Sequence, residues 1–162
     1  MIPRELEELL TQIRTPVILA TAGEEPHATP MNWFYDGDFW ISPAGGTRKM
    51  RNMRKNKNVC IACLENMHPA GRGFVFWGRI EEMETGFLAF LRHAFILKSM
   101  LEKKSSIGVG IKLLRYARIY AGHPSIKYSA LPWKRYFVKI RILRGRYWLD
   151  RDRHGEKEFT RE

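Results

Sequence analysis

The chain has 162 residues, of which 44% are hydrophobic and 28% are charged. This composition is typical of a one-domain, soluble globular protein, and it excludes an intrinsically disordered chain, a disulfide scaffold and a membrane-spanning protein. The formal net charge is +11; residues 1–86 contribute −1 and residues 87–162 contribute +12. Such an asymmetry indicates an anionic partner, and nucleic acid, a membrane surface and a small anionic ligand all fit it.

The first residues carry acidic side chains. Glu5, Glu7 and Glu8 occupy positions where a signal peptide would be apolar, so we expect a cytoplasmic protein. The longest apolar runs are broken by Arg92, His93 and Lys98, well short of the roughly 20 residues that span a bilayer.

The two cysteines, Cys60 and Cys63, form a Cys-x-x-Cys sequence inside an apolar run. A spacing of three residues places their side chains on opposite faces of a strand. Because the sequence holds no second cysteine pair, we interpret them as small buried residues and predict no metal site.

Hydrophobic periodicity predicts a mainly β chain with helices, beginning with a short amphipathic helix over residues 3–14. The elements that follow are strands at 16–21, 27–35 and 39–42, a helix at 47–57, strands at 59–65 and 73–82, a helical insertion at about 84–132, and strands at 136–144 and 146–149. The last two strands are predicted to meet at a turn at Gly145, and the tail after Asp150 to be loose. The sum is an antiparallel β-barrel of six or seven strands with helices at its ends, in a single domain spanning residues 1–162.

The helix at 47–57 begins with an unusual charge pattern. Thr47 is a good N-cap residue, which puts Arg48 and Lys49 in the first turn, where cations oppose the helix dipole. A bound anion would compensate, held by free backbone N–H groups, the Thr47 hydroxyl and the two cations. A solvated basic face, with Met50 and Met53 in the core, explains the pattern equally well.

Four segments in order resemble the FMN-binding split β-barrel family typified by pyridoxamine 5′-phosphate oxidase. They are Val17–Thr21, the Pro-His-x-x-Pro run from Pro26, Asp36–Ser42, and Thr47–Asn56, which matches (S/T)-R-K-x-x-N-(L/M)-x-x-N. The resemblance covers residues 15–82. It implies a split β-barrel homodimer with FMN at the subunit interface.

The resemblance also implies which residues bind the cofactor. The flavin ring would lie along one strand, its ribityl and phosphate end near the end of the next, and its phosphate at the helix start. In that order the residues are Thr29, Pro30, Met31 and Asn32 for the ring, Ser42 for the ribityl end, and Thr47, Arg48 and Lys49 for the phosphate. Trp77 would reach the flavin from the second subunit, or pack within its own sheet; Asn52 matches a mainly structural family residue.

The resemblance implies an oxidoreductase whose substrate stays undefined. The flavin itself carries the hydride, so the protein needs few acids or bases, and we predict no catalytic residue apart from His27 as a candidate acid/base. Residues Asp152–Gly155 do not match the Arg-x-His substrate clamp of pyridoxamine phosphate oxidases, so vitamin B6 oxidation is not implied.

Alternatives follow from the basic second half. The insertion at about 84–132 fits an anionic substrate, a deazaflavin coenzyme with an acidic tail, or a solvated layer beside a dimer. Nucleic-acid binding would need a recognised motif, which is missing, and clustered cations, whereas these are spread over several elements. Membrane contact through residues 107–120 is the weakest alternative.

Overall fold

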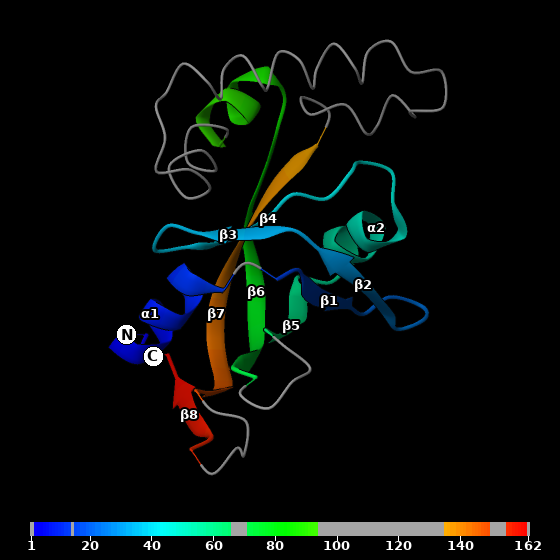
Figure 1. The fold of residues 1–162 in the computed structure, drawn as a ribbon. Helices are drawn as coiled ribbons and strands as arrows, with labels where there is room; N and C mark the ends of the chain where they lie inside the picture. The colour runs from blue at the N-terminus through cyan, green and yellow to red at the C-terminus, as the bar shows by residue number, and fades with distance from the viewer. Residues whose placement is uncertain (1, 14, 66–70, 94–134, 150–154, 162) are drawn as a thin grey trace.

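The computed structural model describes residues 2–13, 15–65, 71–93, 135–149 and 155–161 (Figure 1). Most of the predicted helical insertion lies outside the described residues, as do the stretch 107–120 and residues 152–154. Among the helices that are described, none is long and apolar enough to cross a membrane.

The described chain is mainly β with helices. Its elements are α1 (Arg4–Gln12), β1 (Val17–Thr21), β2 (His27–Met31), β3 (Trp33–Tyr35), β4 (Phe39–Ile41), α2 (Arg48–Lys55), β5 (Asn58–Leu64), β6 (Gly73–Thr85), β7 (Tyr136–Trp148) and β8 (Lys157–Thr160). Residues 87–93 are also helical.

The strands form one antiparallel sheet that curls on itself. Seven strands run in the order β2-β1-β5-β6-β7-β4-β3, and β8 pairs with β7. The first and last strands of this order, β2 and β3, are consecutive in the chain and separated only by Asn32. One bent segment therefore serves both edges, so the sheet must curve until these edges meet. This confirms the predicted split β-barrel with helices.

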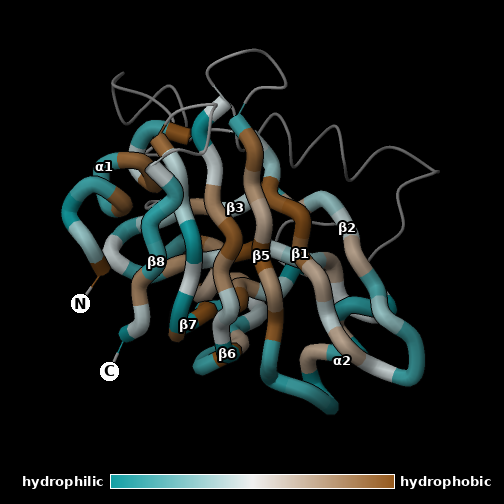
Figure 2. Tube along the Cα trace, turned by 90° about the horizontal axis from the view of Figure 1, so that it is seen from below, coloured by the Kyte–Doolittle hydropathy of each residue, from teal (hydrophilic) through white to brown (hydrophobic). Residues whose placement is uncertain are grey.

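Buried and exposed side chains alternate along the strands, and the buried ones form the core. Phe74 and Phe76 point inward from β6 and stack with their ring centroids 4.3 Å apart. Helix α1 adds its apolar face, on which Leu6, Leu9 and Leu10 are buried in the same cluster. Figure 2 shows the apolar stretches of β1 and β5 side by side. This burial confirms the helix period predicted for α1, and the alternation along β6 agrees with the strand predicted there.

The end of the chain differs from the prediction. Strand β7 runs unbroken through Gly145, so the predicted turn and pair of strands are wrong. A Cβ at Gly145 would stand 2.5 Å from the Phe76 ring and 2.8 Å from the carbonyl oxygen of Val75. Glycine is needed there for close packing between strands and not for a reversal.

The structure differs from the prediction at two further places, the tail of the chain and the helix expected from Glu84. The tail expected to be loose forms β8, because Phe159 packs edge-on against Phe76, and Lys157 pairs with Glu5 where the two chain ends lie close together (Figures 1 and 2). The helix expected from Glu84 begins at residue 87, since β6 continues to Thr85 in register with β7. Both errors arise because pairing with a distant strand decides the structure.

Helix α2 is fixed to the end of β1 by a buried amide. Asn52 is 8% exposed, and its Nδ2 donates to the Thr21 hydroxyl at 3.2 Å. A Cβ at Gly23 would stand 2.3 Å from Asn52 Oδ1, so the turn after β1 must be glycine for α2 to approach. Met50 and Met53 are fully buried beneath the helix. The structural role predicted for Asn52 agrees with this packing.

Asn52→Ala should therefore destabilise the protein by about 1–3 kcal/mol, because it removes a buried hydrogen bond and leaves a cavity. Asn58→Ala is the matched control: Asn58 is exposed on β5, and its side chain makes no hydrogen bond with the described residues. The control should change the free energy of unfolding in urea by less than about 0.5 kcal/mol. Equal losses for the two variants would contradict the anchoring role.

Candidate functional site

The bend at Asn32 faces the end of β4 and the start of α2, and a groove lies between them. This cationic groove has a volume of about 240 Å³ and is lined by Pro16, Pro30, Met31, Asn32, Pro43, Ala44, Lys49 and Arg135. The groove therefore brings together Pro30, Met31 and Asn32, which were predicted to lie along a flavin ring, and Lys49, which was predicted to bind its phosphate. Thr29 lies beside this set, because its hydroxyl contacts Lys49.

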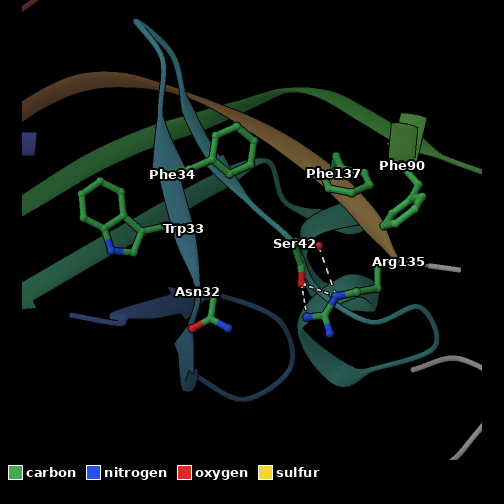
Figure 3. Close-up of a pocket in the computed structure, with 7 residues that line it drawn as sticks. All are labelled: Asn32, Trp33, Phe34, Ser42, Phe90, Arg135 and Phe137. Carbon is green, nitrogen blue, oxygen red and sulfur yellow. Dashed lines mark hydrogen bonds between the residues drawn. The ribbon is translucent and has the colours of Figure 1, made fainter. Parts of the chain in front are cut away.

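A second groove continues from the first. This aromatic groove has a volume of about 210 Å³ and is lined by Asn32, Trp33, Phe34, Ser42, Phe90, Arg135 and Phe137 (Figure 3). Asn32 and Arg135 belong to both grooves, so they mark the junction. The predicted residue Ser42 lies here, on the side of the junction away from Lys49.

Lys49 is the cation of α2 that points into the site. Its side chain is half-buried, and its Nζ lies 3.5 Å from the Thr29 hydroxyl. Burial lowers the pKa of the Lys49 ammonium, and the positive charge of Arg135 lowers it further. Among the described residues no carboxylate pairs with Lys49, and the first turn of α2 holds no acidic residue. An anion in the groove would relieve this repulsion, so the donor set fits a phosphate.

Arg135 holds Ser42 in place. The Arg135 Nε donates to the Ser42 carbonyl oxygen at 3.0 Å and to its Oγ at 3.1 Å, and Nη2 also donates to the carbonyl (Figure 3). Arg135 precedes β7, whose Val138 pairs with Ile41 of β4. This register places a residue of the basic second half beside the site.

Arg135 was not predicted as a site residue from the sequence. Ser42 and Arg135 are 93 positions apart in the chain. The only local signal is a basic residue immediately before a predicted strand, and the second half offers many basic residues. The pairing of β4 with β7 is what selects this one.

Arg48 and Thr47 do not face either groove. Arg48 is exposed and pairs with Glu25, with 3.1 Å between Nη1 and Oε2, beside a separate cavity that also holds Lys55. Thr47 is the N-cap residue, but its hydroxyl donates to the Ala44 carbonyl oxygen at 3.0 Å and makes no cap. The predicted N-cap position of Thr47 is therefore confirmed, although the hydroxyl does not close the cap, and its role in phosphate binding stays a prediction.

His27 begins β2 and lines neither groove. It pairs in register with Thr21, whose hydroxyl donates to the His27 carbonyl oxygen at 3.4 Å. The structure thus places the candidate acid/base at the far end of the strand from Asn32.

Trp77 lies on the outer face of the sheet, half-buried under the Arg144 guanidinium, which stands 5.1 Å from the ring centre. The same face carries a set of apolar side chains from neighbouring strands, which we call the apolar sheet face. Its members are Ala28, Pro30, Ile18, Ala20, Cys60, Ala62, Val75 and Trp77, in registered rows across β2, β1, β5 and β6. Pro30 also lines the cationic groove, so the groove opens beside this face.

The cysteines lie on opposite faces of β5, as their spacing predicted: Cys63 is buried and Cys60 half-buried. Burial raises the pKa of both thiols, which keeps them protonated and unreactive. In the part of the chain that the structure describes, no group of three potential metal ligands occurs.

Solved structures share this fold at low sequence identity. A conserved hypothetical protein from Mycobacterium tuberculosis has a TM-score of 0.67 and 20% identity, with 100% of this chain and 92% of that chain covered. An FAD-binding protein from Mesorhizobium loti has a TM-score of 0.57 and 20% identity, covering 91% and 96%. An F420 reductase has a TM-score of 0.57 and 18% identity, covering 89% and 98%.

No curated protein matches the chain. Residues 2–94 match the family model described as pyridoxamine 5′-phosphate oxidase, which is more than half of the sequence. The match includes β1 to β6 and α2, which provide most of both grooves. The chain therefore belongs to the pyridoxamine 5′-phosphate oxidase family.

Proposed function

We propose that this protein is an FMN-binding oxidoreductase that works as a homodimer. The observation that carries the proposal is the half-buried Lys49 ammonium in the cationic groove, beside the charge of Arg135. The cofactor phosphate would lie against Lys49, and the flavin ring along the segment from Thr29 to Asn32.

Electrostatics support the phosphate. A phosphate would accept a charge-assisted hydrogen bond from Lys49 and interact favourably with Arg135, replacing a repulsion between two cations with attractions to one anion. Hydrogen bonds to charged groups contribute about 1.5–3 kcal/mol each. Arg48 is held by Glu25, so the proposal rests on Lys49 with Arg135 in place of the expected pair of Arg48 and Lys49.

The bend between β2 and β3 supports the position of the ring. Asn32 pairs in neither strand and is exposed, so its backbone and side-chain amides are available to the polar edge of a flavin. A bound flavin supplies hydride transfer, and the protein residues orient it and adjust its electronic properties. The enzyme would act on a small-molecule substrate, and the surrounding cations favour an anionic one.

The apolar sheet face supports a homodimer. Strand β1 is apolar on both faces, since Val17 and Leu19 are fully buried while Ile18 is 44% exposed on the outside. Strands that are apolar on both sides are typical of sheets covered on both sides. A second copy seated here would lie next to Pro30, at the edge of the cationic groove, so a cofactor there would contact both subunits.

A deazaflavin coenzyme is the second candidate. An F420 reductase shares the fold, and the phosphate group of a deazaflavin coenzyme would be the part that Lys49 binds. Titration of the colourless protein with FMN and with the deazaflavin separates the two: we expect FMN to bind more tightly, and a preference for the deazaflavin would favour this alternative.

Lys49→Met should weaken FMN binding by roughly 10- to 150-fold, which corresponds to the loss of one charge-assisted bond. Riboflavin lacks the phosphate, so its dissociation constant should change less than about twofold. Both constants follow from the quenching of flavin fluorescence on titration with the protein.

The control for this variant is Lys55→Met on the same helix. Its ammonium is exposed and lies 3.6 Å from Glu24. It should leave FMN binding within about twofold of the unchanged protein. The phosphate position would be refuted by equal weakening of FMN and riboflavin in Lys49→Met, or by an equal effect of Lys55→Met.

Ile18→Lys should convert the dimer to a monomer in sedimentation velocity and weaken FMN binding, because it places a charge in the proposed interface. Leu88→Lys is the control, since Leu88 is 81% exposed on the helix at 87–93 and lies off the apolar sheet face. The proposed assembly would be contradicted if the protein without substitutions is a monomer, or if the Ile18→Lys variant is still a dimer.

A further inference from the structure

The aromatic groove extends beyond the cofactor positions of the proposed function, with which it shares Asn32 and Arg135 at the junction. Its walls are Phe34 of β3, Phe90 of the helix at 87–93 and Phe137 of β7, and its polar groups gather at the junction end, at Asn32, Ser42 and Arg135 (Figure 3). A groove with apolar walls and polar groups at one end orients a ligand that is itself divided in this way.

The walls are held by packing from behind. Phe34 stacks on Trp40 at 6.0 Å between ring centroids with an interplanar angle of 3°. Phe137 stacks on the buried His93 at 4.5 Å and 19°. Trp40 also contacts the His93 ring, at 4.4 Å. The groove is thus preformed by interlocked rings.

His93 fixes the helix that carries Phe90. Its ring is fully buried, and its Nε2 lies 2.9 Å from Oε2 of Glu84 on β6. Glu84 also accepts a hydrogen bond from Arg92 at 3.1 Å. These contacts join the helix at 87–93 to the sheet, so the position of the Phe90 wall is set by the pairing of the buried His93 ring with the partly exposed Glu84 carboxylate.

The charge of the groove is one-sided. None of the described residues that line it is acidic, and Arg135 stands at the junction, with Lys49 in the adjoining cationic groove. The nearest wall-supporting carboxylate, Glu84, is already paired with His93 and Arg92. The field at the junction therefore favours a negatively charged ligand group.

The size of the groove limits the ligand. Its volume of about 210 Å³ is below the range of about 300–1,000 Å³ of sites for drug-sized ligands. Flat rings gain most from contact with aromatic walls, in stacked or edge-to-face arrangements. One or two fused rings with one anionic substituent fit these limits.

We propose that the aromatic groove binds the substrate, and that the substrate is a flat, apolar aromatic carboxylate. Its rings lie between Phe34, Phe90 and Phe137, and its carboxylate points to the junction at Arg135. As a statement about the substrate this rests on the proposed flavin site, because the junction residue Asn32 would border both the ring of the cofactor and the bound molecule. The apolar walls offer no partners for the several polar substituents of a pyridine phosphate.

The test uses 2-naphthoate as the probe, with calorimetric titration of the full-length protein with and without FMN. We expect 2-naphthoate to bind at least about tenfold more tightly than its neutral counterpart 2-naphthalenemethanol and than cyclohexanecarboxylate, and FMN to leave its affinity unchanged within about twofold. Tighter binding of pyridoxine 5′-phosphate, equal binding of the three probes, or competition with FMN would overturn the proposal.

Variants locate the probe. Phe90→Ala should weaken 2-naphthoate roughly tenfold, and Phe87→Ala, on the same helix but 60% exposed and outside both grooves, should change it less than about twofold. Equal effects of the two would also overturn the proposal. Lys49→Met should weaken FMN binding by the factor given above and leave the affinity for 2-naphthoate unchanged, so failure of the cofactor site and failure of this groove give different results. The comparison of probes on the protein without substitutions tests the groove even if Phe90→Ala does not fold.

Discussion

Two cationic side chains, Lys49 and Arg135, lie close enough for the charge of Arg135 to depress the pKa of the Lys49 ammonium. Elements from both halves of the chain hold them there. Asn52 anchors α2 against β1, which sets Lys49, and the register of β4 with β7 sets Arg135. Holding two like charges together at a partly buried position costs free energy. This pair lies beside the bend at Asn32, where one segment closes the sheet. Strain of this kind is typical of a site completed by a ligand.

The predictions that succeeded depended on local patterns. The spacing of Leu6, Leu9 and Leu10 gave the helix α1, and the odd separation of Cys60 and Cys63 gave their opposite faces on β5. The charge pattern at the start of α2 pointed to Arg48 and Lys49 together, and the structure places Lys49 in the cationic groove. These features depend on neighbours in sequence, so a single sequence contains them.

The predictions that failed depended on partners far along the chain. Gly145 looks like a turn residue, yet the Phe76 ring on β6 is what excludes a side chain there. The tail is charged and looks loose, yet Phe159 finds Phe76 and β8 forms. Partners distant in sequence also separate Arg48 from Lys49, which are adjacent in the chain: Arg48 pairs with Glu25 of the turn before β2, whereas Lys49 lines the cationic groove. Arg135 could not be distinguished from other basic residues until β4 and β7 were paired.

The charge state of Lys49 is the most direct measurable consequence of a phosphate bound at this position. NMR of isotopically labelled lysine side chains, assigned with Lys49→Met, gives the pKa of this ammonium in the protein without ligand, with FMN and with riboflavin. Without ligand we expect the pKa of Lys49 to lie below that of exposed lysines, because of burial and the charge of Arg135. FMN should raise this pKa, and riboflavin should change it little. A pKa that FMN leaves unchanged, or that riboflavin raises equally, would contradict the phosphate position on which the proposed function depends.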